Sequence, residues 1–362
     1  MKLTLIRDYP KEGWESIEVY ANNIVACIRS IPHTKIIIRD YRAFPKIASS
    51  LRTQNQFLKF LYRFAFNPLG ARFSQGDVNH IVDQSNALML YLLNREKTII
   101  TCHDLIGLWY KLRFKTKAIV YEIEPLKIAK HILCVSQFTK SELITKVGIN
   151  PDIITVIPES IETFFKPTSE SEKNTCMQKY HLPPRYILHV GTVLFHKNIL
   201  FLLRLFAENL KRQKDIYLVK VGATFDQEQQ QLIRRLGIEQ RVISLGFVTR
   251  KDLPAIYSGA SLYIQPSLLE GFGLTVLEAM SCGCPVIVSD IPVFRELFST
   301  GAVFMNTQSL SESVKTVREL LGNITKRKLH SQLSIRNSKI YSPANVAKLL
   351  NNYYLRIASQ NN

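Results

Sequence analysis

Short apolar runs alternate along most of this chain with stretches of helical periodicity, and this alternation restricts the fold more than any other feature. Many of the apolar runs are rich in Val and Ile and are bounded by Gly, Pro or charged residues, as strands are. Strands that alternate with helices predict an α/β fold, in which parallel sheets are covered by helices on both faces. We expect strands at residues 2–6, 35–38, 78–82, 98–101, 131–135, 186–190, 216–221, 242–245, 262–265 and 285–288, and helices at 197–212, 227–236 and 272–280.

The length of 362 residues is too great for one ordinary hydrophobic core, so we expect two domains. Polar residues with Pro and Ser gather at 158–174, which is typical of a linker. We therefore predict one doubly wound domain at 1–165 and a second at 175–342. The helical stretch at 343–362 is expected to pack back onto the first domain. Ligands of such sheets bind at the carboxyl ends of the strands, here in a cleft shared by the two domains.

Charge and cysteine usage narrow the class of protein further. The net charge of +18 suits phosphorylated ligands or anionic membranes, and without a long Lys/Arg block we predict no nucleic-acid partner. The six cysteines are scattered, and the pair Cys282 and Cys284 has no second cluster beside it, so we expect buried reduced thiols and no metal site. The apolar run at Leu3–Ile6 is too short for a signal peptide, and no run approaches the ~18 residues of a membrane span, which favours a cytoplasmic protein.

The segment 270–289 carries the clearest chemistry. Glu270 lies in a loop interrupted by Gly271 and Gly273, Glu278 lies inside an expected helix, and a buried strand follows. Unpaired amides at a helix start attract anions, and glycines let the backbone approach a ligand closely. Two isolated glutamates would favour an ordinary helix start with an exposed side chain. The glycines and the following strand instead favour a phosphate held by amides between two hydroxyl-binding carboxylates, which fits a sugar nucleotide.

Together with this segment, four others resemble the retaining glycosyltransferases of family GT4, which have the GT-B fold. The resemblance implies two Rossmann-like doubly wound domains that face each other across a cleft, with the donor held mainly by the second. It also implies transfer of a sugar from a nucleotide-diphosphate donor to an acceptor hydroxyl with retention of configuration, in the synthesis of cell-surface polysaccharide or glycolipid. The four segments, in the order of the family, are Thr101–Leu105, Val135–Leu143, Val156–Pro158 and His189–Asn198.

The resemblance assigns donor-binding roles within the segment that begins at Glu270. Glu270 would contact hydroxyl groups of the donor sugar, and Glu278 would contact the ribose. Charge-assisted hydrogen bonds of this kind contribute roughly 1.5–3 kcal/mol each. The amides of the loop would face the diphosphate, and the loop consists of Gly271, Phe272, Gly273 and Leu274.

The family's phosphate loop corresponds to residues 189–198 of this chain. A Lys at a helix start is usually a solvated charge, but the resemblance implies that Lys197 neutralises the leaving diphosphate beside the turn at Gly191. Many relatives place an Arg where this chain has Thr192 or His196. The imidazole of His196 would donate to phosphate only in part, because its unperturbed pKa is about 6.5.

Three further residues correspond to ligand-binding positions of the family. His103 would contact the donor sugar without acting as a general base, although a histidine satisfied by the protein, with Asp104 as a helix cap, is the alternative. Gly13 stands where relatives have a glycine-rich loop, and an ordinary helix start explains it equally well. Val248 lies in a turn that packs on the nucleotide base in the family, and a hydrophobic core turn is the alternative.

The partners follow from the same resemblance. No Asp-x-Asp pair occurs in the sequence, so we expect neither a metal nor another cofactor. The donor would be GDP-mannose or a UDP-sugar, and the acceptor a glycan or lipid-linked sugar. The basic, aromatic segments Tyr41–Phe73 and Trp109–Lys117 suit either peripheral contact with an anionic membrane or packing on the first sheet. The alternative function is a catalytically silent sugar-nucleotide-binding or membrane-scaffold protein of the same fold.

Overall fold

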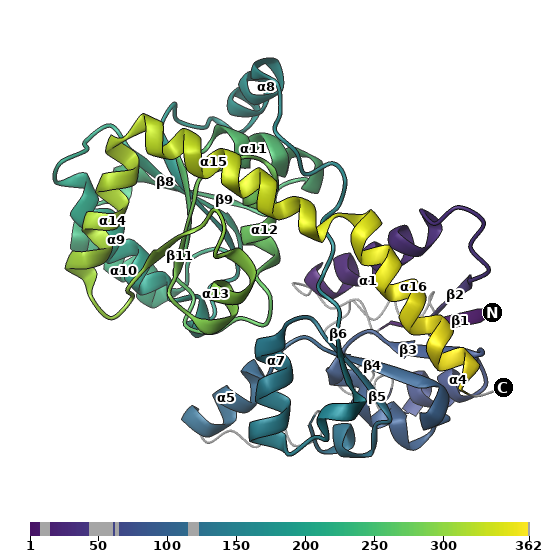
Figure 1. The fold of residues 1–362 in the computed structure, drawn as a ribbon. Coiled ribbons are helices and arrows are strands. Elements are labelled where there is room, and N and C mark those ends of the chain that lie inside the picture. Colours follow the sequence, from purple (N-terminus) through teal and green to yellow (C-terminus); the bar gives the residue numbers. More distant parts are fainter. Residues whose placement is uncertain (8–14, 43–60, 62–64, 115–122, 361–362) are drawn as a thin grey trace. The chain divides into compact units, whose positions relative to one another are not determined.

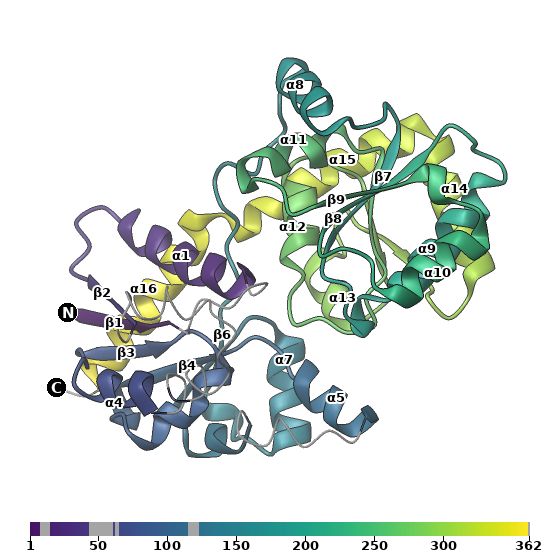
Figure 2. The same cartoon turned by 180° about the vertical axis from the view of Figure 1, so that it is seen from behind.

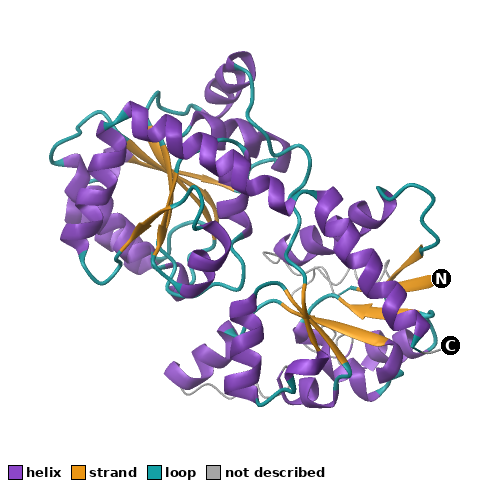
Figure 3. Cartoon of the chain, in the orientation of Figure 1, coloured by secondary structure: helices purple, strands orange, loops and turns teal. Residues whose placement is uncertain are grey.

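The computed structural model describes residues 1–7, 15–42, 61, 65–114 and 123–360. The chain divides into two units (Figure 1). Unit 1 comprises Met1–Ser160 and Pro343–Asn362, and unit 2 comprises Ile161–Ser342. Each unit is built around one parallel sheet with six strands among the described residues. Figure 3 shows the strands of each sheet lying between helices, which is the doubly wound arrangement expected from the sequence.

The sheet of unit 2 has the strand order β12-β11-β10-β7-β8-β9. Counted from the first strand of the unit, this is the Rossmann order 3-2-1-4-5-6 read from the other edge. Helices α9, α10 and α14 pack together, and α11, α12 and α15 form a second packed group (Figures 1 and 2). The strands are β7 (Tyr186–Gly191), β8 (Tyr217–Gly222), β9 (Val242–Gly246), β10 (Leu262–Gln265), β11 (Val286–Ser289) and β12 (Val303–Met305). The helices are α8 (Glu170–Tyr180), α9 (Ile199–Leu210), α10 (Gln227–Leu236), α11 (Leu253–Gly259), α12 (Leu274–Ser281), α13 (Pro292–Phe298), α14 (Leu310–Gly322) and α15 (Ile324–Ser338).

The sheet of unit 1 has the strand order β2-β1-β3-β4-β5-β6, so the direction in which successive strands are added reverses between β1 and β3, although all strands are parallel. The last helix, α16 (Pro343–Ser359), packs on α1 (Glu15–Arg29) and on β3. The strands are β1 (Lys2–Ile6), β2 (Ile37–Tyr41), β3 (Val78–Ile81), β4 (Thr98–Cys102), β5 (His131–Cys134) and β6 (Ile154–Val156). The remaining α-helices of the described residues are α4 (Asn67–Arg72), α5 (Ile106–Phe114) and α7 (Gln137–Glu142).

Most expected elements are confirmed, and the differences have local causes. The strand expected at 35–38 occupies Ile37–Tyr41, at an edge of the sheet where three of its five residues are exposed and the apolar pattern fades. The helix expected from 197 begins at Ile199, because Asn198 adopts a left-handed conformation with φ of 57°. The helix expected from 272 begins at Leu274, after Gly273 with φ of 104°. The strands β6 and β12 were not expected as elements.

Several inner strands are buried along their whole length, as strands of a parallel sheet covered on both faces are. All residues of β4, β10 and β11 are buried. The six cysteines are buried and free, which confirms the expected reduced thiols. Within the described residues, no helix combines the length and the apolar character that a bilayer crossing requires.

Candidate donor site and the network at His103

The sheet of unit 2 reverses its winding between β7 and β10, and ligands of open α/β sheets bind beside such a point. The chain leaves β7 at Gly191 and leaves β10 at Gln265. Both ends lie at the carboxyl edge of the sheet, because the two strands are parallel neighbours. The loops after them bring together residues that are far apart in the sequence.

Lys197 and Glu270 meet at this edge. The Lys197 Nζ atom lies 2.7 Å from Glu270 Oε1, although the residues are 73 positions apart. Both side chains are largely buried, with 18% and 8% of their surfaces exposed. Lys197 ends the single 3₁₀ turn Phe195–Lys197 and precedes α9, so it lies at a helix start rather than within a helix. Two residues for which the resemblance implies contact with the donor are thus in direct contact with each other.

Polar neighbours hold the Glu270 carboxylate in place. The Ser267 hydroxyl donates to Oε1 over 2.7 Å, and the Gln265 amide donates to the same atom over 3.0 Å. The Tyr263 hydroxyl in turn lies 2.7 Å from Gln265 Oε1. Burial raises the pKa of Glu270, but the charge of Lys197 together with the hydrogen bonds from Lys197 and Ser267 leaves the pKa below its ordinary value. Glu270 is therefore an anion at neutral pH, and its position is fixed by the loop after β10.

The loop after Glu270 delivers the amino end of α12 to the same region. Gly273 precedes the helix, and its carbonyl accepts the first helical hydrogen bonds, from Val276 and Leu277. A Cβ atom at Gly273 would lie 2.7 Å from the Phe294 ring, so both the φ of 104° and the packing require glycine. Gly271 and Phe272 are buried, whereas Gly273 and Leu274 are partly exposed.

Glu278 is only 1% exposed and has protein partners for both oxygens. The Arg250 guanidinium donates to Oε1 over 2.8 Å, and the Tyr257 hydroxyl donates to Oε2 over 2.9 Å. Burial raises the pKa of Glu278 despite these partners. Arg250 also pairs with Glu162, so one guanidinium bridges two carboxylates. Nearby in the sequence, Val248 is partly buried.

The end of β7 and the turn after it contain buried polar atoms without partners in the described structure. These atoms are Thr192 Oγ1 and His189 Nε2. A Cβ atom at Gly191 would come within 3.9 Å of His189 Nε2, so the histidine lies directly beside this turn. Burial, reinforced by the charge of Lys197, lowers the pKa of His196 to about 4, so this imidazole is neutral at physiological pH.

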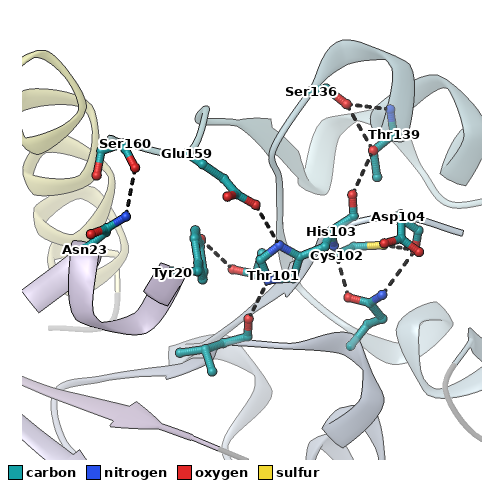
Figure 4. A network of polar contacts seen from close by, with 12 residues as sticks. Tyr20, Asn23, Thr101, Cys102, His103, Asp104, Ser136, Thr139, Glu159 and Ser160 are labelled. Atoms are coloured by element: carbon teal, nitrogen blue, oxygen red, sulfur yellow. Dashed lines mark hydrogen bonds and ion pairs between the residues drawn. The ribbon is translucent and has the colours of Figure 1, made fainter. Parts of the chain in front are cut away.

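In unit 1, His103 follows β4 and forms the centre of a polar network (Figure 4). Its Nδ1 lies 3.1 Å from Glu159 Oε1, and its Nε2 lies 2.9 Å from the Val82 carbonyl oxygen. Burial lowers the pKa of His103, but the hydrogen bond and charge of Glu159 outweigh it and raise the pKa to about 9. Both ring nitrogens therefore donate, which argues against a general base. Asp104 accepts the amide of Ile106 and caps α5, as expected.

Gly13 lies outside the described residues, as do large parts of the basic segments 41–73 and 109–117. Several polar residues at the sites were assigned no role from the sequence. For Lys220 a signal was available, because it is a charged residue within the expected strand 216–221. The full set comprises Glu159, Glu162, His189, Lys220, Arg250, Gln265 and Ser267.

The chain forms two doubly wound units, which is the architecture of GT-B glycosyltransferases. In unit 2 an acidic and a basic side chain are paired beside the amino end of a helix, at the switch point of the sheet. The particular family follows from sequence matches. Residues 26–163 match the family described as Glycosyltransferase Family 4, and residues 173–336 match Glycosyl transferases group 1. The two matches together span most of the chain, which therefore belongs to these glycosyltransferases.

Individual relatives agree with this assignment. The O-antigen chain mannosyltransferase RfbU of Salmonella typhimurium is 33% identical over 238 residues, which are 63% of this chain and 62% of that protein. The O-antigen chain mannosyltransferase B of Escherichia coli is 29% identical over 73% of this chain and 72% of its own length. The crystal structure of Anabaena Alr3699/HepE in complex with UDP-glucose has a TM-score of 0.78 at 18% identity, covering 98% of this chain and 100% of that chain. This structural likeness supports the fold.

Proposed function

We propose that the protein transfers a sugar from a nucleotide-diphosphate donor to an acceptor hydroxyl, with retention of configuration, in the synthesis of a cell-surface polysaccharide. The observation that carries this proposal is the buried contact of 2.7 Å between Lys197 and Glu270 at the switch point of unit 2. The names of the O-antigen mannosyltransferase relatives favour mannose as the sugar, and thus GDP-mannose as the first donor to test. A UDP-sugar is the next candidate.

In the proposed mechanism, the donor diphosphate lies against the loop Gly271–Leu274 and the ammonium of Lys197. Negative charge grows on the diphosphate as the bond to the sugar breaks, and preorganised cations and amides stabilise such charge. Glu270 accepts hydrogen bonds from sugar hydroxyls and keeps Lys197 in position. Among the residues that the structure describes, no side chain at this edge is an evident base, so the departing diphosphate itself would take the proton of the acceptor. Neither a metal nor a further cofactor is invoked.

The assignment of Lys197 and Glu270 is tested by single substitutions in the full chain. We expect Lys197→Ala and Glu270→Ala each to lower kcat/KM at least about 100-fold, the effect of removing one preorganised transition-state contact. The measurement is transfer of radiolabelled mannose from GDP-mannose, and of the sugars of UDP donors, to a lipid-linked acceptor. Lys211→Ala is the matched control, because Lys211 forms an exposed pair with Glu208.

Circular dichroism and thermal unfolding show whether each variant is folded. Activity like that of the wild type in a folded Lys197→Ala or Glu270→Ala variant contradicts the site assignment. Donor binding by the wild type without transfer to any acceptor would instead favour a silent sugar-nucleotide-binding protein.

We also propose that unit 1 makes peripheral contact with an anionic membrane, where a lipid-linked acceptor would lie. Support comes from α4 and its flanks, where Leu69 and Phe73 are 51% and 83% exposed beside the basic Arg72. We expect flotation with vesicles that contain anionic lipid at physiological salt, and reduced flotation of a Leu69→Ser/Phe73→Ser variant. Exposed Leu329→Ser is the control, because this residue lies in unit 2. Absence of wild-type flotation removes the proposal.

A further inference from the structure

Lys220 on β8 is a buried cation without an acidic partner. It is 1% exposed, and among the described residues no carboxylate lies within ion-pair distance of its ammonium group. On the neighbouring strands its register partners are His189 of β7 and Ser244 of β9. Burying an ammonium group without a counter-charge is costly, so the position calls for a physical explanation.

The ammonium group of Lys220 binds two carbonyl groups that end neighbouring strands. Its Nζ donates to the Gly191 carbonyl over 3.1 Å and also donates to the Ala223 carbonyl. Gly191 ends β7, and Ala223 directly follows β8. The turns after these strands touch each other, because a Cβ atom at Gly222 would lie 2.5 Å from the Gly191 carbonyl oxygen. One buried side chain thus fixes the turns of two adjacent strands.

The planarity of the peptide bond determines what this arrangement does to the next amides. In a trans peptide the carbonyl and the following N–H point in opposite directions. Since the carbonyls of Gly191 and Ala223 point toward Lys220, the amides of Thr192 and Thr224 point away from it. Neither amide has an acceptor within the described parts of the chain. Two donors are therefore presented beside the turn that precedes Lys197.

We propose that Lys220 is a positioning residue for the diphosphate of the donor. It orients the amides of Thr192 and Thr224 toward phosphate oxygens, and the bound diphosphate supplies the counter-charge that the ammonium group lacks. Thr192 and His196, beside this turn, are uncharged at neutral pH, so Lys220 provides the second positive charge from beneath the turn. The inference rests on the proposed function, because it requires a nucleoside diphosphate at this edge of unit 2.

Proton linkage gives the inference a specific signature. Burial lowers the pKa of Lys220 to about 8, and a neighbouring anion would raise it again. The other groups of this cluster are Glu270, His189, His196 and Lys197. Burial lowers the pKa of His189 to about 3, and the pKa of His196 is about 4, so neither imidazole titrates between pH 6.5 and 9. Diphosphate binding at pH 8 should therefore be accompanied by proton uptake at Lys220.

The test compares full-length wild type with Lys220→Met, using inorganic pyrophosphate, GDP and UDP as ligands and guanosine and uridine as ligands without phosphate. By calorimetry we expect Lys220→Met to bind the diphosphates about 10- to 100-fold more weakly, as after loss of a charge-assisted contact, and the nucleosides within about twofold of wild type. Exposed Lys214→Met, just before β8, is the matched control. Calorimetry at pH 8 in Tris and HEPES should show proton uptake by wild type that is absent from Lys220→Met.

The outcomes separate this inference from the proposed function. Diphosphate affinity and proton uptake that are unchanged in Lys220→Met overturn the role of Lys220 and leave the proposed function standing. Equal weakening of diphosphates and nucleosides also overturns it, because a general distortion of the fold would produce that result. If Lys220→Met does not fold, absence of proton uptake by wild type at pH 8 still overturns the inference. If wild type binds none of the five ligands, both proposals fall.

Discussion

At the scale of single residues, each unit contains a buried charged side chain that is paired with a side chain of opposite charge. His103 is a buried cation paired with Glu159, and Glu270 is a buried anion paired with Lys197. His103, Lys197 and Glu270 were predicted from the sequence, because each lies in a motif whose residue types and spacing are typical of the family. The partner of His103 was not predicted, because Glu159 lies 56 positions away and only the folded chain brings the two together.

The ion pair of His103 should make unfolding depend on pH. The pKa of His103 is raised from 6.5 to about 9, so its contribution to stability is full below about pH 6.5 and is lost as pH rises through about 9. Glu159→Gln removes the main cause of the shift. We expect the difference in unfolding free energy between wild type and Glu159→Gln to shrink by up to about 3 kcal/mol between pH 6 and 9.

Guanidinium denaturation at these two pH values measures the difference. Glu124→Gln is the matched control, because its exposed pair with Lys127 should contribute little at either pH. A difference between wild type and Glu159→Gln that is constant from pH 6 to 9 would show that His103 is not charged in the folded protein.

At the scale of elements, hydrophobic periodicity predicted most of the strands and helices. The residues at which helices begin and end depend on the local backbone geometry there. The helix α10 lies at the expected residues, because Asp226 and Gln229 form a capping box at its start and Gly237 ends it. The strands β6 and β12 have three residues each, which is too short for an alternating or continuous apolar pattern to stand out. The starts of α9 and α12 were set by left-handed residues, whose conformation a hydrophobic pattern does not encode.

The glycine before α12 gives a prediction at this scale. Gly273→Ala must adopt φ of 104° and place a methyl group 2.7 Å from the Phe294 ring, so we expect a loss of roughly 2–4 kcal/mol in unfolding free energy and a displaced loop with reduced transfer. Gly237→Ala is the matched control. Its φ is 64° with open space around the new methyl group, so it should cost only about 1 kcal/mol and leave transfer unchanged. Equal effects of the two substitutions would contradict the role of packing at Gly273.

At the scale of the whole molecule, the last helix completes unit 1. Residues of α16 are buried against that unit, and the hydroxyl of Tyr354 lies 2.8 Å from His80 Nδ1. His80 Nε2 continues the chain of contacts to Thr101 over 2.7 Å. The sequence predicts a helical stretch at 343–362 that packs back on the first domain. The partner of Tyr354 was not predicted, because His80 on β3 lies 274 positions before it and only the folded chain brings the two together.

Removing this contact should affect one unit and spare the other. Tyr354→Phe leaves a ring nitrogen of His80 without its buried partner, at a cost of about 1–3 kcal/mol. We expect faster amide hydrogen exchange in β3, β4 and α16, with unchanged exchange in β7, β10 and β11. Exposed Tyr91→Phe should change neither set. Faster exchange in both sheets of Tyr354→Phe would mean that the two units unfold as a single cooperative body.

Both termini belong to unit 1, and Figure 1 shows the N and C labels on that unit. Unit 2 is therefore inserted between Ser160 and Pro343 rather than appended to one end. A chimera in which unit 2, with Lys197 and Glu270, is replaced by that of a relative therefore needs two junctions, one at each end of the unit. A single crossover would leave the recipient with a foreign closing helix, mismatched against His80.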